Sequence, residues 1–201
     1  MVLNNKLNLT DQIELSKAEE RLSKIGAKEL FDSNRLKELT PGTFQSLRVI
    51  HKYLFDKIYY FAGEIRTENI AKGSFRFASV LYLNESIKKI EQMPQKTFDE
   101  IIEKYVEMNV AHPFREGNGR SLRIWLDDIL KKELGKAVDW SKIDKENYLI
   151  AMINSPTDDK SIKELIKNAL TDKVDDRELY MKGIDHSYFY EGYSEYKTSE
   201  L

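Results

Sequence analysis

Residues 110–123 read V-A-H-P-F-R-E-G-N-G-R-S-L-R and join one helical pattern to the next. Gly117 and Gly119 lack a Cβ, so the backbone between them can turn sharply and approach a ligand closely. Apolar residues then recur with helical spacing at 122, 126, 129 and 130. The glycine turn is therefore expected at a helix N-terminus, where unpaired N–H groups and the helix dipole favour an anion.

The polar side chains of this stretch suit a metal-bound polyphosphate. Arg120 and Arg123 are three residues apart and share a helix face, where two guanidinium groups can hold phosphates. Glu116 offers one hard oxygen ligand, and phosphate-bound Mg²⁺ often takes only one or two protein carboxylates. His112 can accept a proton near neutral pH, and Pro113 is expected to keep its backbone extended. An isolated His, an Arg pair or a GNG turn is usually structural, so the prediction rests on their joint occurrence.

The stretch H-P-F-R-E-G-N-G-R-S-L-R resembles the signature of Fic-domain proteins, H-x-F-x-[DE]-G-N-G-R-x-x-R, with every fixed position filled. The resemblance implies an all-α Fic fold, a helical bundle with one short β-hairpin flap beside the active site. It also implies a protein adenylyltransferase that moves AMP from ATP to a Tyr, Ser or Thr hydroxyl of a target protein. By position, His112 would be the general base and Glu116 would hold Mg²⁺ between the α- and β-phosphates.

The same resemblance implies a phosphate site made of Gly117, Asn118, Gly119, Arg120 and Arg123. Within it, Arg120 would hold the β-phosphate region and Arg123 the γ-phosphate, while Phe114 would point into the core and fix the loop. Many members have Asp at the position of Glu116, so the metal preference can differ. Some members transfer phosphate and carry a Lys near the second glycine, but Gly119 stands here, which favours AMP transfer.

Residues 69–78 change to a period of two, with Phe75 and Phe77 on one side, which predicts a short strand or hairpin. The preceding F-A-G-E-I-R at 61–66 resembles a segment found before the flap of many Fic domains. A strand edge can bind an extended peptide, and the resemblance implies a flap that aligns the target residue. The alternative is a hairpin that only covers the core. The predicted flap consists of Lys72, Gly73, Ser74, Phe75, Arg76 and Phe77.

Near the C-terminus, Ser187-x-x-x-Glu191-Gly192 resembles the Fic inhibitory motif [ST]-x-x-x-E-[GN] in its C-terminal, class III position. Ser187 and Glu191 are one helical turn apart and share a face. A Glu191 carboxylate paired with Arg123 would occupy the guanidinium otherwise used for the γ-phosphate, so that ATP would bind with misplaced phosphates. The alternative is an ordinary exposed glutamate. The neighbouring Tyr188 is a candidate for self-modification, which would stop the helix from redocking.

Periodicity and capping residues predict helices over 11–25, 29–39, 43–60, 86–93, 98–111, 121–134, 144–153 and 161–170. His51 lies in the apolar stripe of one of these helices and is expected to be structural. We expect a Fic domain over residues 1–183, with its core at about 44–170, and an autoinhibitory helix and tail over 184–201.

Composition narrows the class of protein. The chain has 201 residues, net charge −2 and no Cys, so no basic field points to nucleic acid and nothing points to disulfides. No export signal or membrane-spanning run is recognised, which predicts a cytoplasmic, bacterial protein. Class membership implies a target such as a type II topoisomerase subunit, for example gyrase B. A homo-oligomer, removal of AMP assisted by Glu191, and an inactive nucleotide-sensing binding module held shut by its tail remain alternatives.

Overall fold

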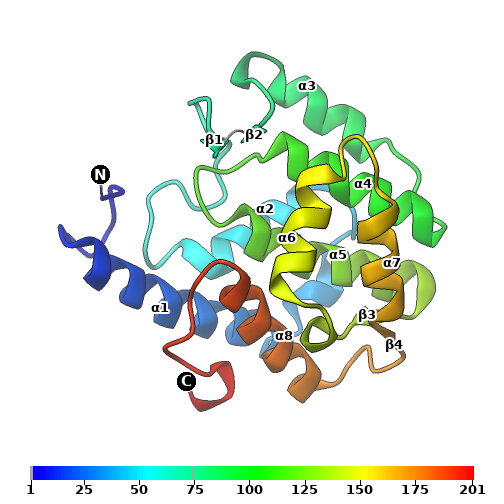
Figure 1. Ribbon diagram of the computed structural model, residues 1–201. Helices are drawn as coiled ribbons and strands as arrows, with labels where there is room; N and C mark the ends of the chain where they lie inside the picture. Colours follow the sequence, from blue (N-terminus) through cyan, green and yellow to red (C-terminus); the bar gives the residue numbers. More distant parts are fainter. Residues whose placement is uncertain (1, 74) are drawn as a thin grey trace.

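A computed structural model describes residues 2–73 and 75–201, and it confirms the predicted all-α bundle (Figure 1). The helices are α1 Gln12–Asp32, α2 Phe44–Phe55, α3 Val80–Glu91, α4 Phe98–Ala111, α5 Asn118–Leu134, α6 Lys145–Asn154, α7 Lys160–Asn168 and α8 Arg177–Tyr190. Short 3₁₀ turns occupy Arg35–Glu38, Trp140–Lys142 and Thr198–Glu200. Two antiparallel pairs of two-residue strands complete the described part, β1 Ala71–Lys72 with β2 Phe75–Arg76 and β3 Ala137–Val138 with β4 Leu170–Thr171.

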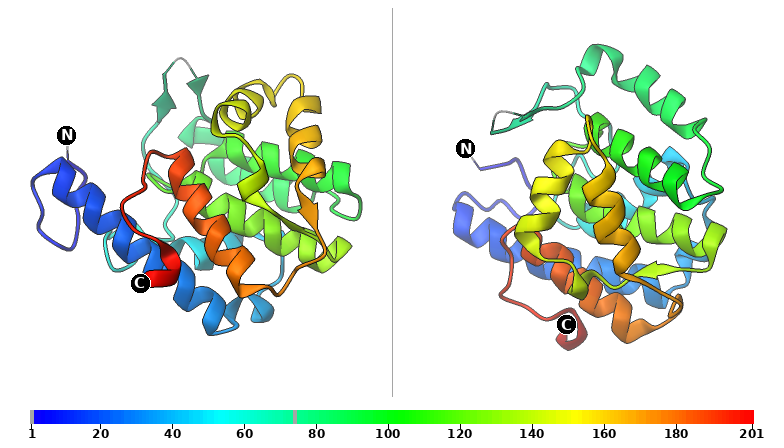
Figure 2. Two further views of the ribbon diagram at one scale, coloured as in Figure 1. Left: turned by 60° about the horizontal axis from the view of Figure 1, so that its bottom comes forward. Right: turned by 45° about the vertical axis from the view of Figure 1, so that its right-hand side comes forward.

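Helix α5 runs through the middle of the bundle. Its apolar side chains Leu122, Trp125, Leu126 and Ile129 are fully buried. The indole N–H of Trp125 donates to the carbonyl of Thr43 at 3.0 Å, which fixes α5 against the start of α2. Figure 2 shows α6 and α7 on one side of this helix and α1 with α8 on another. The helix that follows the glycine turn is therefore a rigid base for the site.

Side-chain caps begin α1, α2 and α4 at the residues that the sequence predicts. Asp11 accepts N–H bonds at the start of α1, and Thr43 does so for α2. Thr97 and Glu100 form a reciprocal capping box that starts α4, the helix that leads into the motif. Gly135 adopts the left-handed conformation that ends α5.

Several predicted boundaries are wrong for physical reasons. The predicted break after residue 25 is absent, because Gly26, Ala27 and Leu30 continue the buried face of α1 to Asp32. The backbone of Gly26 packs so closely on α2 that a Cβ would lie 2.1 Å from the Tyr53 carbonyl oxygen. The helix predicted to run to residue 60 ends at Phe55 and continues as tight turns.

Three more differences concern the start of α3, the β3–β4 pair and the start of α8. Helix α3 begins at Val80, before the predicted residue 86, because Ser79 caps it although Leu81 and Tyr82 in its first turn are exposed. The β3–β4 pair was not predicted. Helix α8 begins at Arg177, so the expected boundary at 183/184 lies inside a helix.

No helix in the described part of the chain combines the length and apolar content needed to cross a bilayer.

Candidate active site

His112 ends α4 in a strained conformation. Its backbone is left-handed (φ 49°, ψ 63°), so the predicted extended geometry is wrong, and its N–H donates to the Met108 carbonyl at 3.0 Å. A non-glycine residue in this region costs about 1–3 kcal/mol and needs support from its surroundings. That support comes from Arg66, whose Nε donates to the His112 carbonyl at 2.8 Å and whose backbone N–H donates to the Pro113 carbonyl at 2.8 Å. Arg66 is the arginine of the F-A-G-E-I-R segment.

The imidazole of His112 is prepared to accept a proton. Nδ1 lies 3.1 Å from the Asn109 carbonyl, which can only accept, so Nδ1 carries the proton and Nε2 keeps its lone pair. The ring stacks on Phe77 with centroids 3.6 Å apart. Burial lowers the pKa of His112 to about 4, although Asn109 and Glu191 act to raise it. The ring is therefore neutral at pH 7, the form that a general base requires.

Three side chains hold the loop between α4 and α5 in place. Asn118 accepts from the Phe114 N–H and donates to the Phe114 carbonyl, both at 2.8 Å. Phe114 is fully buried, as predicted, and stacks on the ring of His51. His51 Nε2 lies 2.8 Å from the Glu116 carbonyl, and its Nδ1 accepts from the Gly63 N–H. Since both amide atoms of its side chain bind Phe114, Asn118 can offer only its backbone N–H to a ligand.

Both glycines of the turn lie where a side chain would not fit. A Cβ on Gly117, which has φ +78°, would lie 2.3 Å from the Phe55 ring. A Cβ on Gly119 would lie 2.6 Å from Glu191 Oε1 and 3.1 Å from Arg123 Nη1. The start of α5 is thus bare backbone beside the Arg123 guanidinium, a surface suited to phosphate, and the Glu191 carboxylate lies next to it in this structure.

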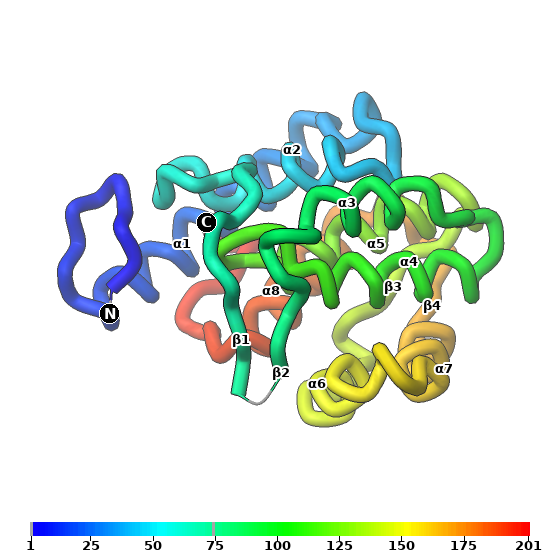
Figure 3. Tube along the Cα trace, turned by 90° about the horizontal axis from the view of Figure 1, so that it is seen from above, coloured from blue at the N-terminus to red at the C-terminus, as the bar shows by residue number. Residues whose placement is uncertain are grey.

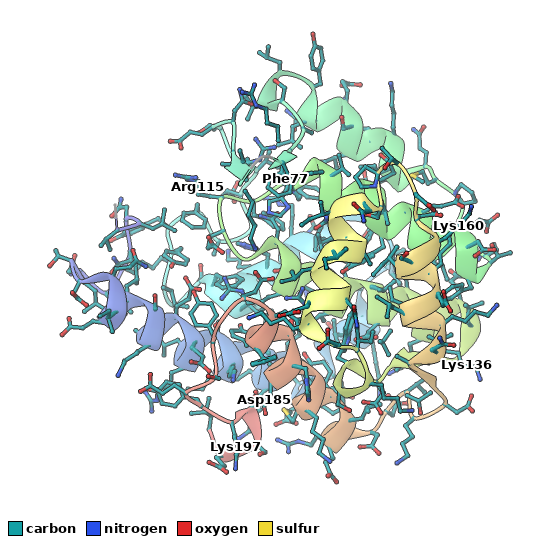
Figure 4. The ribbon with its side chains drawn as sticks, in the orientation of Figure 1. Phe77, Arg115, Lys136, Lys160, Asp185 and Lys197 are labelled. Carbon is teal, nitrogen blue, oxygen red and sulfur yellow. The ribbon has the colours of Figure 1, made fainter. Side chains whose placement is uncertain are left out.

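A cavity of about 470 Å³ lies over this turn. Figure 3 shows the β1–β2 hairpin projecting beside the bundle on the side of α6, and Figure 4 places Phe77 and Arg115 at the base of the hairpin. The cavity brings together the motif residues with parts of the flap and of the C-terminal motif. Its lining includes His112, Glu116, Gly117, Asn118, Gly119, Arg120, Arg123, Lys72, Phe75, Phe77, Tyr148 and Glu191.

Glu116 is the carboxylate that could hold a metal ion here. Its side chain is 45% exposed, and Oε1 accepts from the Gly117 N–H at 2.9 Å and from Arg120 Nη2 at 3.0 Å. Across the described residues, no group of three or more His, Cys, Asp or Glu is arranged as a metal cage. A single carboxylate beside a phosphate cradle fits Mg²⁺ that arrives with a nucleotide and takes its other ligands from phosphate and water.

Arg123 is held by the C-terminal helix. Its Nε donates to Ser187 Oγ at 2.6 Å, and Nη2 donates to the Ser187 carbonyl at 2.9 Å and to Glu191 Oε1 at 3.0 Å. Nη1 lies 3.3 Å from the Tyr148 hydroxyl. Burial raises the pKa of Glu191, but the charge of Arg123 and then that of Lys72 outweigh it, and the pKa falls to about 2. The predicted pair of Glu191 with Arg123 is therefore present in this structure.

Unlike Arg123, Arg120 points its side chain toward α1. Its Nη1 lies 2.6 Å from Glu19 Oε1, and both side chains are almost completely buried. The rings of Phe55, Tyr188 and Tyr193 surround the guanidinium, each with its centroid 4.9–5.2 Å from Cζ. The role of Glu19 could not be predicted from the sequence, since its only signal there is a glutamate inside an amphipathic helix.

The remaining predicted residues lie around the cavity or behind it. The predicted hairpin is confirmed, with Lys72 opposite Phe75. Lys72 Nζ lies 3.3 Å from Glu191 Oε2, Gly73 has φ +60°, and Arg76 is exposed. Ser74 lies outside the described residues. Tyr188 is fully buried, and Gly192, the last residue of the predicted inhibitory motif, has φ +93°.

Comparison with known proteins gives one consistent result. Residues 41–130 match the Fic/DOC family. The chain is 30% identical over 168 residues to the probable protein adenylyltransferase y4lH of Sinorhizobium fredii, covering 77% of this chain and 83% of that protein. It is also 30% identical over 167 residues to the protein adenylyltransferase VbhT of Bartonella schoenbuchensis, where the match covers 77% of this chain and only 34% of the relative.

A solved structure supports the fold. The crystal structure of the BepC effector protein of Bartonella tribocorum with bound AMPPNP superposes with a TM-score of 0.68 at 21% identity. The superposition covers 85% of this chain and 93% of that chain. The shared helical arrangement thus extends well beyond the residues of the motif.

Proposed function

The chain belongs to the Fic/DOC family, and we propose that it is a protein adenylyltransferase that transfers AMP from ATP to a hydroxyl of a target protein. The observation that carries this proposal is the arrangement at the start of α5. A neutral His112 imidazole, a bare glycine turn and the guanidinium of Arg123 line one cavity. The AMPPNP bound by BepC supports ATP as the co-substrate.

The proposed reaction begins with ATP seated on the N–H groups of residues 118–120. His112 Nε2 takes the proton from the target's hydroxyl, and that oxygen attacks the α-phosphorus. The bond from the α-phosphorus to the bridging oxygen breaks, and pyrophosphate leaves. The N–H groups at the start of α5 stabilise the charge on the α-phosphate oxygens. Glu116 would hold Mg²⁺, which supplies charge neutralisation on the α- and β-phosphates.

We propose that the structure represents the inhibited state. The γ-phosphate needs the guanidinium of Arg123, but Ser187 and Glu191 occupy three of its N–H directions. The space beside Gly119 is also filled, since Glu191 Oε1 lies only 2.6 Å from the position a Cβ would take there. ATP would therefore bind with its phosphates displaced, and a displacement of about 1 Å can cost 10²-fold in rate.

Target recognition is assigned to the flap. Lys72 and Phe75 line the cavity beside His112, and the short hairpin has a free edge that can pair with an extended segment of a target. A type II topoisomerase subunit such as gyrase B is the first target to test.

Self-modification of Tyr188 would require α8 to undock from the bundle. Tyr188 belongs to α8, is fully buried with its ring against Arg120, and is not among the residues that line the cavity. We expect AMP on Tyr188 only in a state where Glu191 has already left Arg123. Intact-mass measurement after incubation with Mg·ATP would show added AMP in Glu191→Gly and little in wild type.

Transfer of labelled AMP tests the proposal. With bacterial lysate as the source of targets, Glu191→Gly is expected to label at least one protein strongly, wild type weakly, and His112→Ala/Glu191→Gly not at all. Nucleotide binding to each variant is measured in parallel. If Glu191→Gly binds ATP tightly and labels neither a lysate protein nor purified gyrase B, the protein is a nucleotide-sensing module.

A further inference from the structure

Glu19 is a buried carboxylate that no motif includes. It lies in α1, far from the motif in sequence, and its side chain is 3% exposed. Oε1 lies 2.6 Å from Arg120 Nη1 and accepts from the Tyr193 hydroxyl at 2.7 Å, while Oε2 accepts from the Tyr59 hydroxyl. Burial alone would raise its pKa, but Arg120 and the two hydroxyls lower it, so Glu19 is charged at neutral pH.

Arg120 shares its charge between two carboxylates. Nη1 binds Glu19, and Nη2 binds Glu116 Oε1 at 3.0 Å. A fully buried guanidinium is stable only if its charge is compensated. Glu116 is half-exposed on the cavity side, whereas Glu19 is enclosed, so Glu19 is the counter-charge of Arg120 that lies inside the fold.

We propose that Glu19 is a positioning residue for the metal ligand Glu116, because it supplies the counter-charge of Arg120. With that charge in place, Arg120 can orient Glu116 through one oxygen and leave the carboxylate able to bind Mg²⁺. This inference rests on the proposed function, since it takes Glu116 as the ligand of the nucleotide-bound metal.

Two effects would follow from loss of the Glu19 charge, and both weaken metal binding. The uncompensated Arg120 would repel a divalent cation bound at Glu116. It would also draw the Glu116 carboxylate more strongly into its own ion pair. Removing a residue that orients a metal ligand without binding the metal itself typically lowers metal affinity by about 10–100-fold. We expect the lower end, about tenfold, because Glu19 acts through Arg120.

The test measures binding of Mn²⁺ by electron paramagnetic resonance in the presence of AMPPNP, with Glu191→Gly as the parent protein. Glu19→Gln should raise the Kd for Mn²⁺ about tenfold. Glu20→Gln is the matched control, because Glu20 is equally buried on the same helix but pairs with Lys24 at 3.0 Å and accepts from the tail N–H groups of Glu195 and Tyr196. It should leave the Kd within about twofold of the parent. Equal Kd values for the two variants would overturn the inference.

A further variant separates charge from packing. Glu19→Gln/Arg120→Met removes both charges of the buried pair, a change that proteins often tolerate. If the counter-charge is what matters, this protein should bind Mn²⁺ more tightly than Glu19→Gln, because no uncompensated guanidinium remains to repel the metal ion. A folded double variant whose Kd for Mn²⁺ equals that of Glu19→Gln would show that the uncompensated charge of Arg120 does not weaken the site.

Glu116→Gln distinguishes this inference from the proposed function. It should abolish the nucleotide-linked Mn²⁺ site. If Mn²⁺ binds Glu116→Gln as it binds the parent, the metal assignment of Glu116 fails, whatever the result for Glu19.

Discussion

Arg120 and Arg123 are three residues apart on α5 and both are buried, yet their counter-charges are held in different ways. Glu19 lies inside a 21-residue helix, and two tyrosine hydroxyls also bind its carboxylate. Glu191 caps the C-terminal end of α8, is 20% exposed and is followed by Gly192. We therefore propose that the ion pair is a fixed structural contact at Arg120 and a detachable one at Arg123. Under this proposal, the position of the carboxylate in the chain, more than its chemistry, distinguishes a structural ion pair from a regulatory one.

Removing each arginine should give the largest measurable difference between the two ion pairs. Arg120→Met leaves Glu19 buried without a counter-charge and should lower the free energy of unfolding by about 3–5 kcal/mol. Arg123→Met should cost less, about 1–2 kcal/mol, because Glu191 can turn toward solvent and Lys72. Urea unfolding at pH 7 measures both. Equal losses would contradict the distinction between a fixed and a detachable pair.

Acid should weaken the ion pair of Glu191 with Arg123 over a defined range of pH. The pKa of Glu191 is lowered to about 2 in the folded state, against a usual value of 4.5. Its contribution is therefore complete above about pH 4.5 and lost as the pH falls through about 2, and it amounts to at most about 3 kcal/mol. The difference in unfolding free energy between wild type and Glu191→Gln should shrink from pH 6 to pH 3. A difference that stays constant over this range would argue against a charged Glu191 contact.

The pH dependence of the AMP-transfer rate should show how the ion pair of Glu191 with Arg123 affects the pKa of His112. Burial lowers the pKa of His112 to about 4, and the charge of Glu191 acts against this, so Glu191→Gly should lower it further. Since the neutral ring is the base, kcat/KM of Glu191→Gly should stay level from pH 8 to about 5.5 and fall only nearer pH 4. A half-maximal rate near pH 6.5, the usual pKa of His, would contradict the buried, neutral base.

The smallest effect is expected at the outer contact of Glu191. Lys72 is 71% exposed, and such surface pairs contribute about 0–1 kcal/mol. Lys72→Ala should therefore raise the AMP transfer of wild type by no more than about fivefold, far less than Glu191→Gly does. Activation equal to that of Glu191→Gly would mean that Lys72, and not Arg123, holds the tail.

The sequence predicted those parts of the molecule that local chemistry specifies. Thr97 and Gly135 mark the ends of α4 and α5 because capping depends on neighbouring residues alone. The spacing of Ser187 and Glu191 predicted a shared helix face, and the structure brings both to Arg123. Contacts between helices that are far apart in the chain could not be predicted from the sequence. The pairing of Glu19 with Arg120 depends on how α1 packs, and the strained backbone of His112 depends on Arg66.

Crystal structures of wild type and Glu191→Gly with AMPPNP and Mg²⁺ would test directly whether the carboxylate of Glu191 blocks Arg123. In Glu191→Gly, the γ-phosphate should lie within hydrogen-bond distance of the Arg123 guanidinium, with His112 Nε2 facing the α-phosphorus. In wild type, Glu191 should remain on Arg123 and the γ-phosphate should lie elsewhere. Identical phosphate positions in the two proteins would contradict the account.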